Sequence, residues 1–146
     1  MDEQTKKELE KFIDISAKSQ RNGNLPLIIL EKGAKEPTAS TWSALNSNLV
    51  YFALENDKAE YSLAEKIIEA QNNKKRLVVS MKKDLSSASI NLISKMLNFG
   101  KIDMGGKEVD VVPGTIIGLV DRDFAEKNIS YDNFYNLFSS AFSIKK

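Results

Sequence analysis

The chain has 146 residues, of which 42% are hydrophobic and 28% are charged, and its formal net charge is +1. This length is typical of one domain with its own core, and the near-neutral charge gives no general attraction to nucleic acid or to anionic membranes. The chain contains no cysteine and no histidine, which excludes disulfides, thiol nucleophiles, the commonest general base and the usual zinc ligands.

The N-terminal segment gives no sign of targeting to a membrane. Residues 2–11 are mostly charged or polar, so they do not resemble a signal peptide. The longest apolar runs are well short of the ~20 residues that a membrane-spanning helix needs. We therefore expect a single domain over residues 1–146 with no membrane span and a cytoplasmic location, although export by a route without a signal peptide stays open.

Helical and strand patterns alternate along the chain. Residues 1–20 are predicted to form an amphipathic helix, because Leu9, Phe12, Ile13 and Ala17 recur at helical spacing. Short apolar runs predict strands, and a Gly-Gly pair predicts the turn of a hairpin. In chain order, the further expected elements are a strand at 27–30, a helix at 41–48, a strand at 50–54, a helix around 63–70, a strand at 77–81, a helix at 86–98, a hairpin at 101–112, a strand at 115–120 and a final helix at 131–142.

This alternation predicts an α/β fold, a three-layer sandwich with a mainly parallel sheet. The N-terminal helix and the hairpin would be additions to that sandwich. Ligands of such sheets usually bind beyond the carboxyl ends of the strands. Here that edge would hold the loops that follow Leu30, Met81 and Val120.

The first of these loops partly matches a phosphate-binding loop of the form G-x-x-x-x-G-K-[ST]. In the window from residue 33 to residue 40, Gly33 and Ser40 match, whereas Ala39 replaces the lysine that reaches the phosphates. Pro37 removes one backbone donor, and Glu36 would place a negative charge beside the phosphates. The same residues are equally compatible with an ordinary turn between a strand and a helix that binds no phosphate.

The second half of the chain resembles the core of an AAA+ ATPase, most closely the Clp-type unfoldases. A strand, a helix, a hairpin and a second strand follow one another between Arg76 and Asp123. The hairpin letters Gly100-Lys101-Ile102, Gly105-Gly106 and Lys107-Glu108-Val109-Asp110 carry most of the likeness. The resemblance covers residues 25–124 and implies a P-loop NTPase-like fold.

The same resemblance implies that the catalytic machinery is missing. The Walker B position holds Ser80-Met81 in place of Asp-Glu, and the sensor-1 position holds Asp121 or Arg122 in place of a polar residue such as Asn. We therefore expect no catalytic residues, no cofactor and no metal. The degenerate nucleotide-site positions are Gly33, Ala39, Ser40, Ser80, Met81, Asp121 and Arg122.

Two stretches are candidate surfaces for a partner. Aromatic residues are dense in a helix expected over residues 131–146, and Tyr131, Tyr135, Phe138 and Phe142 would form a patch for another protein or a second copy. The basic run at 74–76 is interpreted as solvated charge and not as a nucleic-acid site.

The sequence thus favours a protein that is not an enzyme. We expect a non-catalytic AAA+-like protein-interaction module, such as an adaptor, an assembly subunit or a secretion accessory subunit, with a protein partner or self-association and no nucleic acid. The alternative is a small α/β protein that binds a nucleotide or another anion through an atypical phosphate loop, using Lys35 or Arg122.

Overall fold

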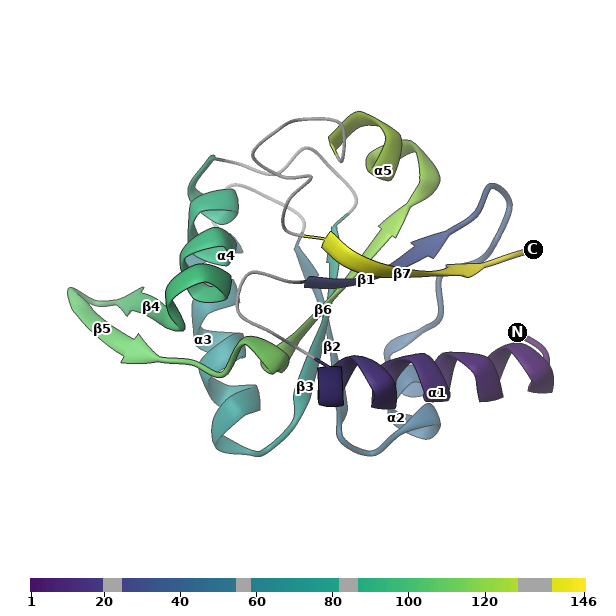
Figure 1. Ribbon diagram of the computed structural model, residues 1–146, viewed down its shortest axis with the longest axis horizontal. Coiled ribbons are helices and arrows are strands. Elements are labelled where there is room, and N and C mark those ends of the chain that lie inside the picture. The colour runs from purple at the N-terminus through teal and green to yellow at the C-terminus, as the bar shows by residue number, and fades with distance from the viewer. Residues whose placement is uncertain (20–24, 55–58, 82–86, 129–137) are drawn as a thin grey trace.

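The computed structural model describes residues 1–19, 25–54, 59–81, 87–128 and 138–146. They form a sheet with helices on both faces and a separate hairpin (Figure 1). The predicted α/β sandwich with three layers is therefore confirmed. Its elements are α1 (Glu3–Ser19), β1 (Leu25–Leu30), α2 (Ala39–Leu45), β2 (Leu49–Leu54), α3 (Ala59–Asn72), β3 (Arg76–Met81), α4 (Ser87–Phe99), β4 (Lys101–Met104), β5 (Lys107–Asp110), η1 (Pro113–Thr115), β6 (Ile116–Asp121), α5 (Arg122–Asn128) and β7 (Phe138–Ile144).

The main sheet has five strands in the order β2-β3-β6-β1-β7, and each neighbouring pair is parallel. The strands β1, β2, β3 and β6 are mostly apolar because both faces of the sheet are covered by helices. Strand β1 lies inside the sheet between β6 and β7, although it contains Pro26. The register of β1 against β7 shifts between Leu25 and Pro26, and β6 pairs only from Leu27 onward, so the proline lies where the ladder is irregular.

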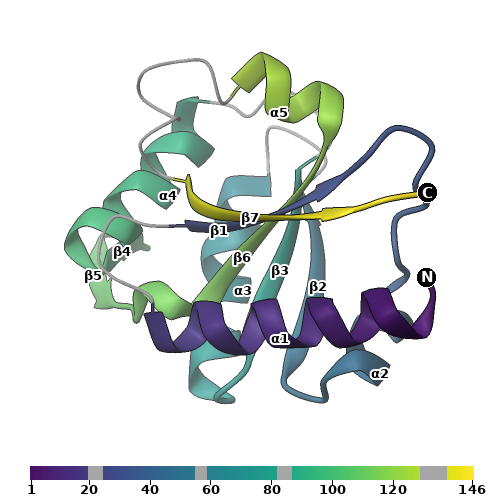
Figure 2. The ribbon, with the colours of Figure 1, turned by 45° about the vertical axis from the view of Figure 1, so that its right-hand side comes forward.

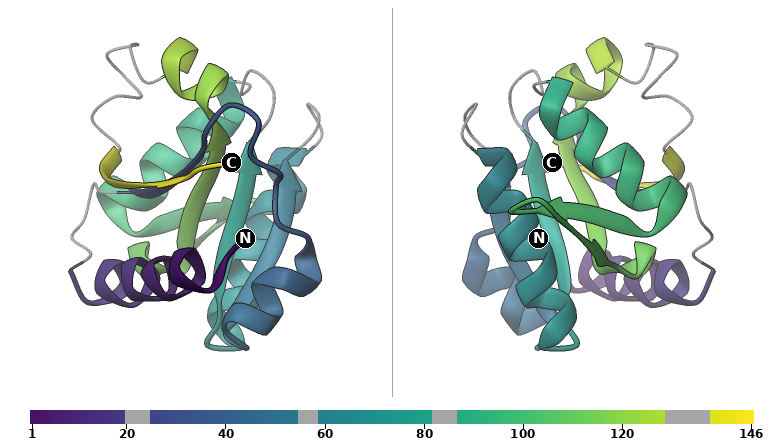
Figure 3. Two further views of the ribbon diagram at one scale, coloured as in Figure 1. Left: turned by 90° about the vertical axis from the view of Figure 1, so that its right-hand side faces the viewer. Right: turned by 90° about the vertical axis from the view of Figure 1, so that its left-hand side faces the viewer.

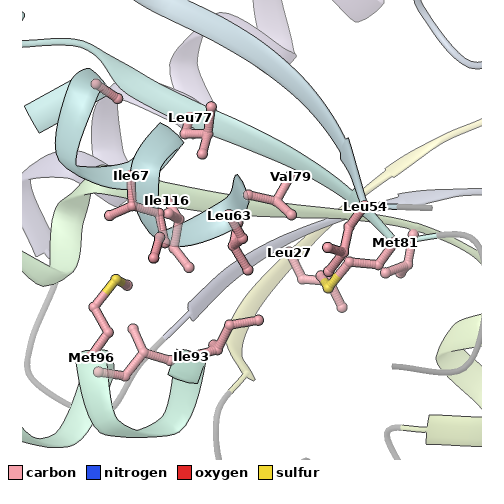
Figure 4. Close-up of a cluster of buried hydrophobic side chains, with 14 of the residues drawn as sticks. Leu27, Leu54, Leu63, Ile67, Leu77, Val79, Met81, Ile93, Met96 and Ile116 are labelled. Atoms are coloured by element: carbon pink, nitrogen blue, oxygen red, sulfur yellow. The ribbon is translucent and has the colours of Figure 1, made fainter. Parts of the chain in front are cut away.

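Each face of the sheet has its own hydrophobic cluster. Helices α1 and α2 cover one face, where Leu9, Ile13 and Trp42 pack on the sheet, and α1 crosses that face in Figure 2. Helices α3, α4 and α5 cover the other face. Figure 4 shows Leu63, Ile67, Ile93 and Met96 pointing from α3 and α4 toward the strand side chains Leu27, Leu54, Leu77, Val79, Met81 and Ile116.

The predicted C-terminal helix is wrong where the structure describes it. Residues 138–144 form β7, an edge strand parallel to β1. The segment FSSAFSI contains two phenylalanines and three serines and has no strong preference of its own. Backbone pairing with β1 decides its conformation, because propensity is a weaker influence than tertiary context. Residues 131–137, including Tyr131 and Tyr135, lie outside the described residues.

The second predicted helix also begins and ends earlier than expected. Helix α2 covers residues 39–45 and not 41–48, because the Thr38 hydroxyl accepts a hydrogen bond from the Thr41 backbone N–H at 3.3 Å and so begins the helix. Ala39 and Ser40 therefore belong to the first turn of α2 and not to the loop.

Arg76 is a second correction, because it is not a solvated surface charge. Its Nε donates to the Gly114 carbonyl at 2.8 Å, its Nη1 to the Ile13 carbonyl at 2.8 Å, and its Nη2 to the Ser16 hydroxyl at 3.2 Å. Burial lowers the pKa of this guanidinium to about 10. Arg76 thus joins α1, the start of β3 and the turn before β6.

Candidate functional site

The topology places a cavity at the carboxyl edge of the sheet. The chain leaves β1 toward α2 on one face and leaves the neighbouring β6 toward α5 on the other face. Adjacent strands whose connections run to opposite faces leave a crevice, which is the usual ligand position in such sheets. Here a cavity of about 320 Å³ is lined by residues 30–34 and 119–123 together with Glu36 and Ser80.

Some of the predicted nucleotide-site residues meet in this cavity, and others do not. Gly33, Ser80, Asp121 and Arg122 line it. Met81 is buried in the hydrophobic cluster on the face of the sheet that α3, α4 and α5 cover. Ala39 lies in the first turn of α2 and does not line the cavity, and Ser40 borders a different cavity between α2 and α1.

Glu36 joins the loop after β1 to two strands. The Ser80 hydroxyl on β3 and the Tyr51 hydroxyl on β2 both donate to the same Glu36 carboxylate oxygen, the second at 3.0 Å. Ser80 is only 2% exposed, so its hydroxyl needs such an acceptor. A carboxylate of the protein itself, bonded to both strands, therefore lines the cavity.

The start of α2 offers little to a bound phosphate. A phosphate loop holds its ligand with free backbone N–H groups at the beginning of a helix. Here the Thr38 hydroxyl already accepts from the Thr41 N–H, and it lies 3.0 Å from the hydroxyls of both Ser40 and Thr41. Within the loop, the Ala34 N–H bonds the Glu31 carbonyl at 2.9 Å, in a turn that Gly33 permits with a φ of +85°.

An ion pair connects the residue after β1 to the start of α5 at the cavity wall. Arg122 donates through Nε to Glu31 at 3.0 Å and through Nη2 to the other Glu31 oxygen. Hydrogen bonds from Arg122 and then from Ser143 lower the pKa of the Glu31 carboxyl to about 2, and the same pair raises the pKa of Arg122. This two-bond geometry engages two of the five N–H donors of the guanidinium with a carboxylate of the protein itself.

Asp121, at the predicted sensor-1 position, caps a helix. Its Oδ1 accepts a hydrogen bond from the Phe124 backbone N–H at 2.7 Å, which fixes the first turn of α5. The lining also contains the carboxylates of Glu31, Glu36 and Asp123, against the basic groups of Lys32 and Arg122. The balance is therefore negative, which disfavours a polyphosphate.

The hairpin is hydrogen-bonded to two helices. It projects from the side of the molecule (Figure 1), and Lys95 of α4 pairs with Asp103 at 2.9 Å and with Glu108 at 3.0 Å. From α3, the Gln71 amide donates to the Asp110 carbonyl at 2.9 Å and accepts from the Val112 N–H at 2.6 Å. These contacts fix its position without a large core of its own.

Two large apolar side chains are exposed at the base of this hairpin. Phe99 is 72% exposed and Val112 is 62% exposed. The ladder pairs Lys101 with Asp110, and the Val111 N–H bonds the Gly100 carbonyl at 2.8 Å. Phe99 and Val112 are the next residues of these two facing chain segments, beyond the open end of the hairpin. Sequence reasoning missed this pair, which we call the hairpin-base pair.

Of the predicted aromatic patch, the structure describes the side chain of Phe142 alone, so the patch as a whole stays a prediction. Phe142 packs its ring against Phe12 of α1, with ring centroids 5.6 Å apart. Phe138 begins β7, and Tyr131 and Tyr135 lie outside the described residues.

Comparison of the sequence with protein-family models and with curated proteins gave no match. Across the described ranges, no group of three or more acidic, His or Cys side chains is arranged to hold a metal ion. Within the same part of the chain, no helix is long and apolar enough to cross a membrane.

Proposed function

We propose that this protein is a protein-interaction module that resembles an AAA+ core and acts without nucleotide turnover. The observation that carries the proposal is the hairpin-base pair, Phe99 and Val112, which presents apolar surface on a hairpin fixed by α3 and α4. Large apolar side chains held rigidly in solvent are typical of binding surfaces. An adaptor or an assembly subunit would use such a surface.

The cavity at the sheet edge supports the non-catalytic part of the proposal. Glu36 lines it and is bonded to Ser80, Asp121 caps α5, and Arg122 is paired with Glu31. Each of these groups already makes a contact within the fold. At the positions that correspond to the catalytic residues of AAA+ proteins, this chain has no residue that would act as a base or bind magnesium. The resemblance to AAA+ proteins rests on the hairpin letters and on the order of helix, hairpin and strand.

One observation favours the alternative, an anion-binding protein. A second cavity, of about 560 Å³, borders the other side of the loop after β1 and is lined in part by Lys35, Lys145 and Lys146. These lysines are exposed, and their attraction for an anion would be weakened by salt. We therefore place this alternative second.

Replacing Phe99 by serine is expected to remove a partner that the wild-type protein captures from a native lysate. Loss of a central aromatic contact commonly weakens a protein complex by tenfold or more. The measurement is quantitative mass spectrometry of proteins retained by each immobilised variant. The matched control is Ile15→Ser, which removes an exposed apolar side chain from α1, far along the chain from the hairpin.

The expected result is a set of proteins that Phe99→Ser loses and Ile15→Ser retains. Equal capture by the wild-type protein and by Phe99→Ser would contradict the assignment of this surface. Circular dichroism of both variants shows whether either substitution has changed the fold.

A further inference from the structure

Strand β7 contributes few side chains to the two hydrophobic clusters. It pairs with β1 at one side of the sheet, and Figure 3 shows it (yellow) on the side opposite to β2. Among the described side chains, the cluster beneath α3, α4 and α5 contains no residue of β7. To the other cluster, β7 contributes the buried Ile144 and the half-buried Phe142. Most of the core would therefore stay covered if β7 were detached.

The two ends of β7 are attached to β1 in different ways. Near the start of β7, the register shifts between Leu25 and Pro26. At its end, the Glu31 backbone N–H donates to the Ile144 carbonyl at 2.9 Å, and the Glu31 carboxylate accepts a hydrogen bond from the Ser143 side chain. The same carboxylate pairs with the first residue of α5. Glu31 is therefore a clamp on the end of β7.

Alternate amides of β1 point to different neighbouring strands. The N–H of Glu31 points to β7, so by alternation the Ile29 N–H also points to β7, whereas the Ile28 N–H points to β6. The same ladder directs the N–H groups of Phe142 and Ile144 back toward β1. Two adjacent amides of one strand thus report separately on its two interfaces.

We propose that β7 is a releasable strap, closed by the clamp at Glu31, which detaches from β1 while β2, β3 and β6 stay folded. The segment FSSAFSI buries less apolar surface than the strand that it covers, LPLIIL. The free energy of a local opening rises with the apolar surface that it exposes, so detachment of β7 should cost less than global unfolding.

Release of the strap would change the wall of the cavity at the carboxyl edge of the sheet. Glu31 and Arg122 both line that cavity. When β7 detaches, Glu31 loses its bonds to Ser143 and Ile144, and its pairing with Arg122 is less constrained. The strap therefore couples the edge of the sheet to the charged groups of the cavity. This inference is independent of the hairpin-base pair.

Native-state hydrogen exchange of the unmodified chain tests the proposal, with nuclear magnetic resonance at increasing low concentrations of urea. The amides of Ile29, Phe142 and Ile144 should exchange through one common opening, with a lower free energy than the opening that exposes Ile28. Equal protection of Ile28 and Ile29, at the level of global unfolding, would overturn the proposal. Three unrelated free energies would also overturn it, because they indicate fraying of single residues.

Two variants test the clamp itself. Glu31→Gln removes the carboxylate charge and should lower the protection factor of Ile29 by about threefold or more, with Ile28 unchanged. The matched control is Asp123→Asn, which removes one charge from an exposed residue at the same edge and should leave Ile29 unchanged. Equal effects of the two variants on Ile29, or an equal loss of protection at Ile28 and Ile29 in Glu31→Gln, would contradict the assignment of Glu31.

Discussion

Replacing Arg76 by methionine is expected to lower the free energy of unfolding by about 3 kcal/mol. Methionine keeps much of the buried hydrocarbon but removes every donor. The carbonyls of Ile13 and Gly114 then lose a charged partner, and α1 loses its hydrogen-bonded connection to β3. Urea denaturation followed by circular dichroism measures the change.

The neighbouring residue supplies the control. Lys75 is exposed, so Lys75→Met removes a positive charge at nearly the same place and should change stability only slightly. Arg76→Lys should recover only part of the loss, because an ammonium cannot reproduce the fork of donors. Equal stabilities of Arg76→Met and Lys75→Met would show that the buried hydrogen bonds contribute little.

Replacing Trp42 by alanine is expected to lower the free energy of unfolding by about 4 kcal/mol. The side chain is fully buried between α2 and the sheet, where it contacts the cluster that α1 also covers. Its indole N–H has no hydrogen-bond partner among the described residues. Trp42→Phe should therefore cost much less, since it removes a polar group that the core does not satisfy and keeps most of the apolar contact.

Urea denaturation followed by circular dichroism also suits this pair, because Trp42 is the only tryptophan and its fluorescence is lost in both variants. An equal loss of stability in Trp42→Phe and Trp42→Ala would mean that the indole nitrogen contributes to the folded state. The difference between the two variants is therefore the informative quantity.

The strands and the hairpin were predictable because their signals are local. Short, β-branched apolar runs such as Leu77-Val78-Val79 are typical of a sheet covered on both faces, and Gly105-Gly106 has the backbone freedom that a tight turn needs. Strand β7 could not be predicted in the same way. Its residues are compatible with a helix or with a strand, and the hydrogen bonds that it makes with the edge of β1 select the strand.

The roles of the site residues depend on contacts between distant segments. Glu36 meets Tyr51 and Ser80 only after β2 and β3 have paired, so the loop alone suggests only an unfavourable charge. Arg76 follows two lysines and looks like surface charge until α1 packs over it. Phe99 did give a signal, since it lies outside the apolar stripe of Ile93, Met96 and Leu97 on α4.

The most direct test of the central claim is a titration of isotope-labelled protein with Mg-ATP, followed by nuclear magnetic resonance. If the negative charge of the cavity lining excludes a polyphosphate, the backbone amides of Gly33, Ala34, Ser80 and Arg122 should keep their chemical shifts. Weak shifts near Lys35 and Lys146 that disappear in added salt would reflect general attraction for phosphate. Saturable shifts at Gly33 and Ala34, with micromolar affinity, would contradict the account.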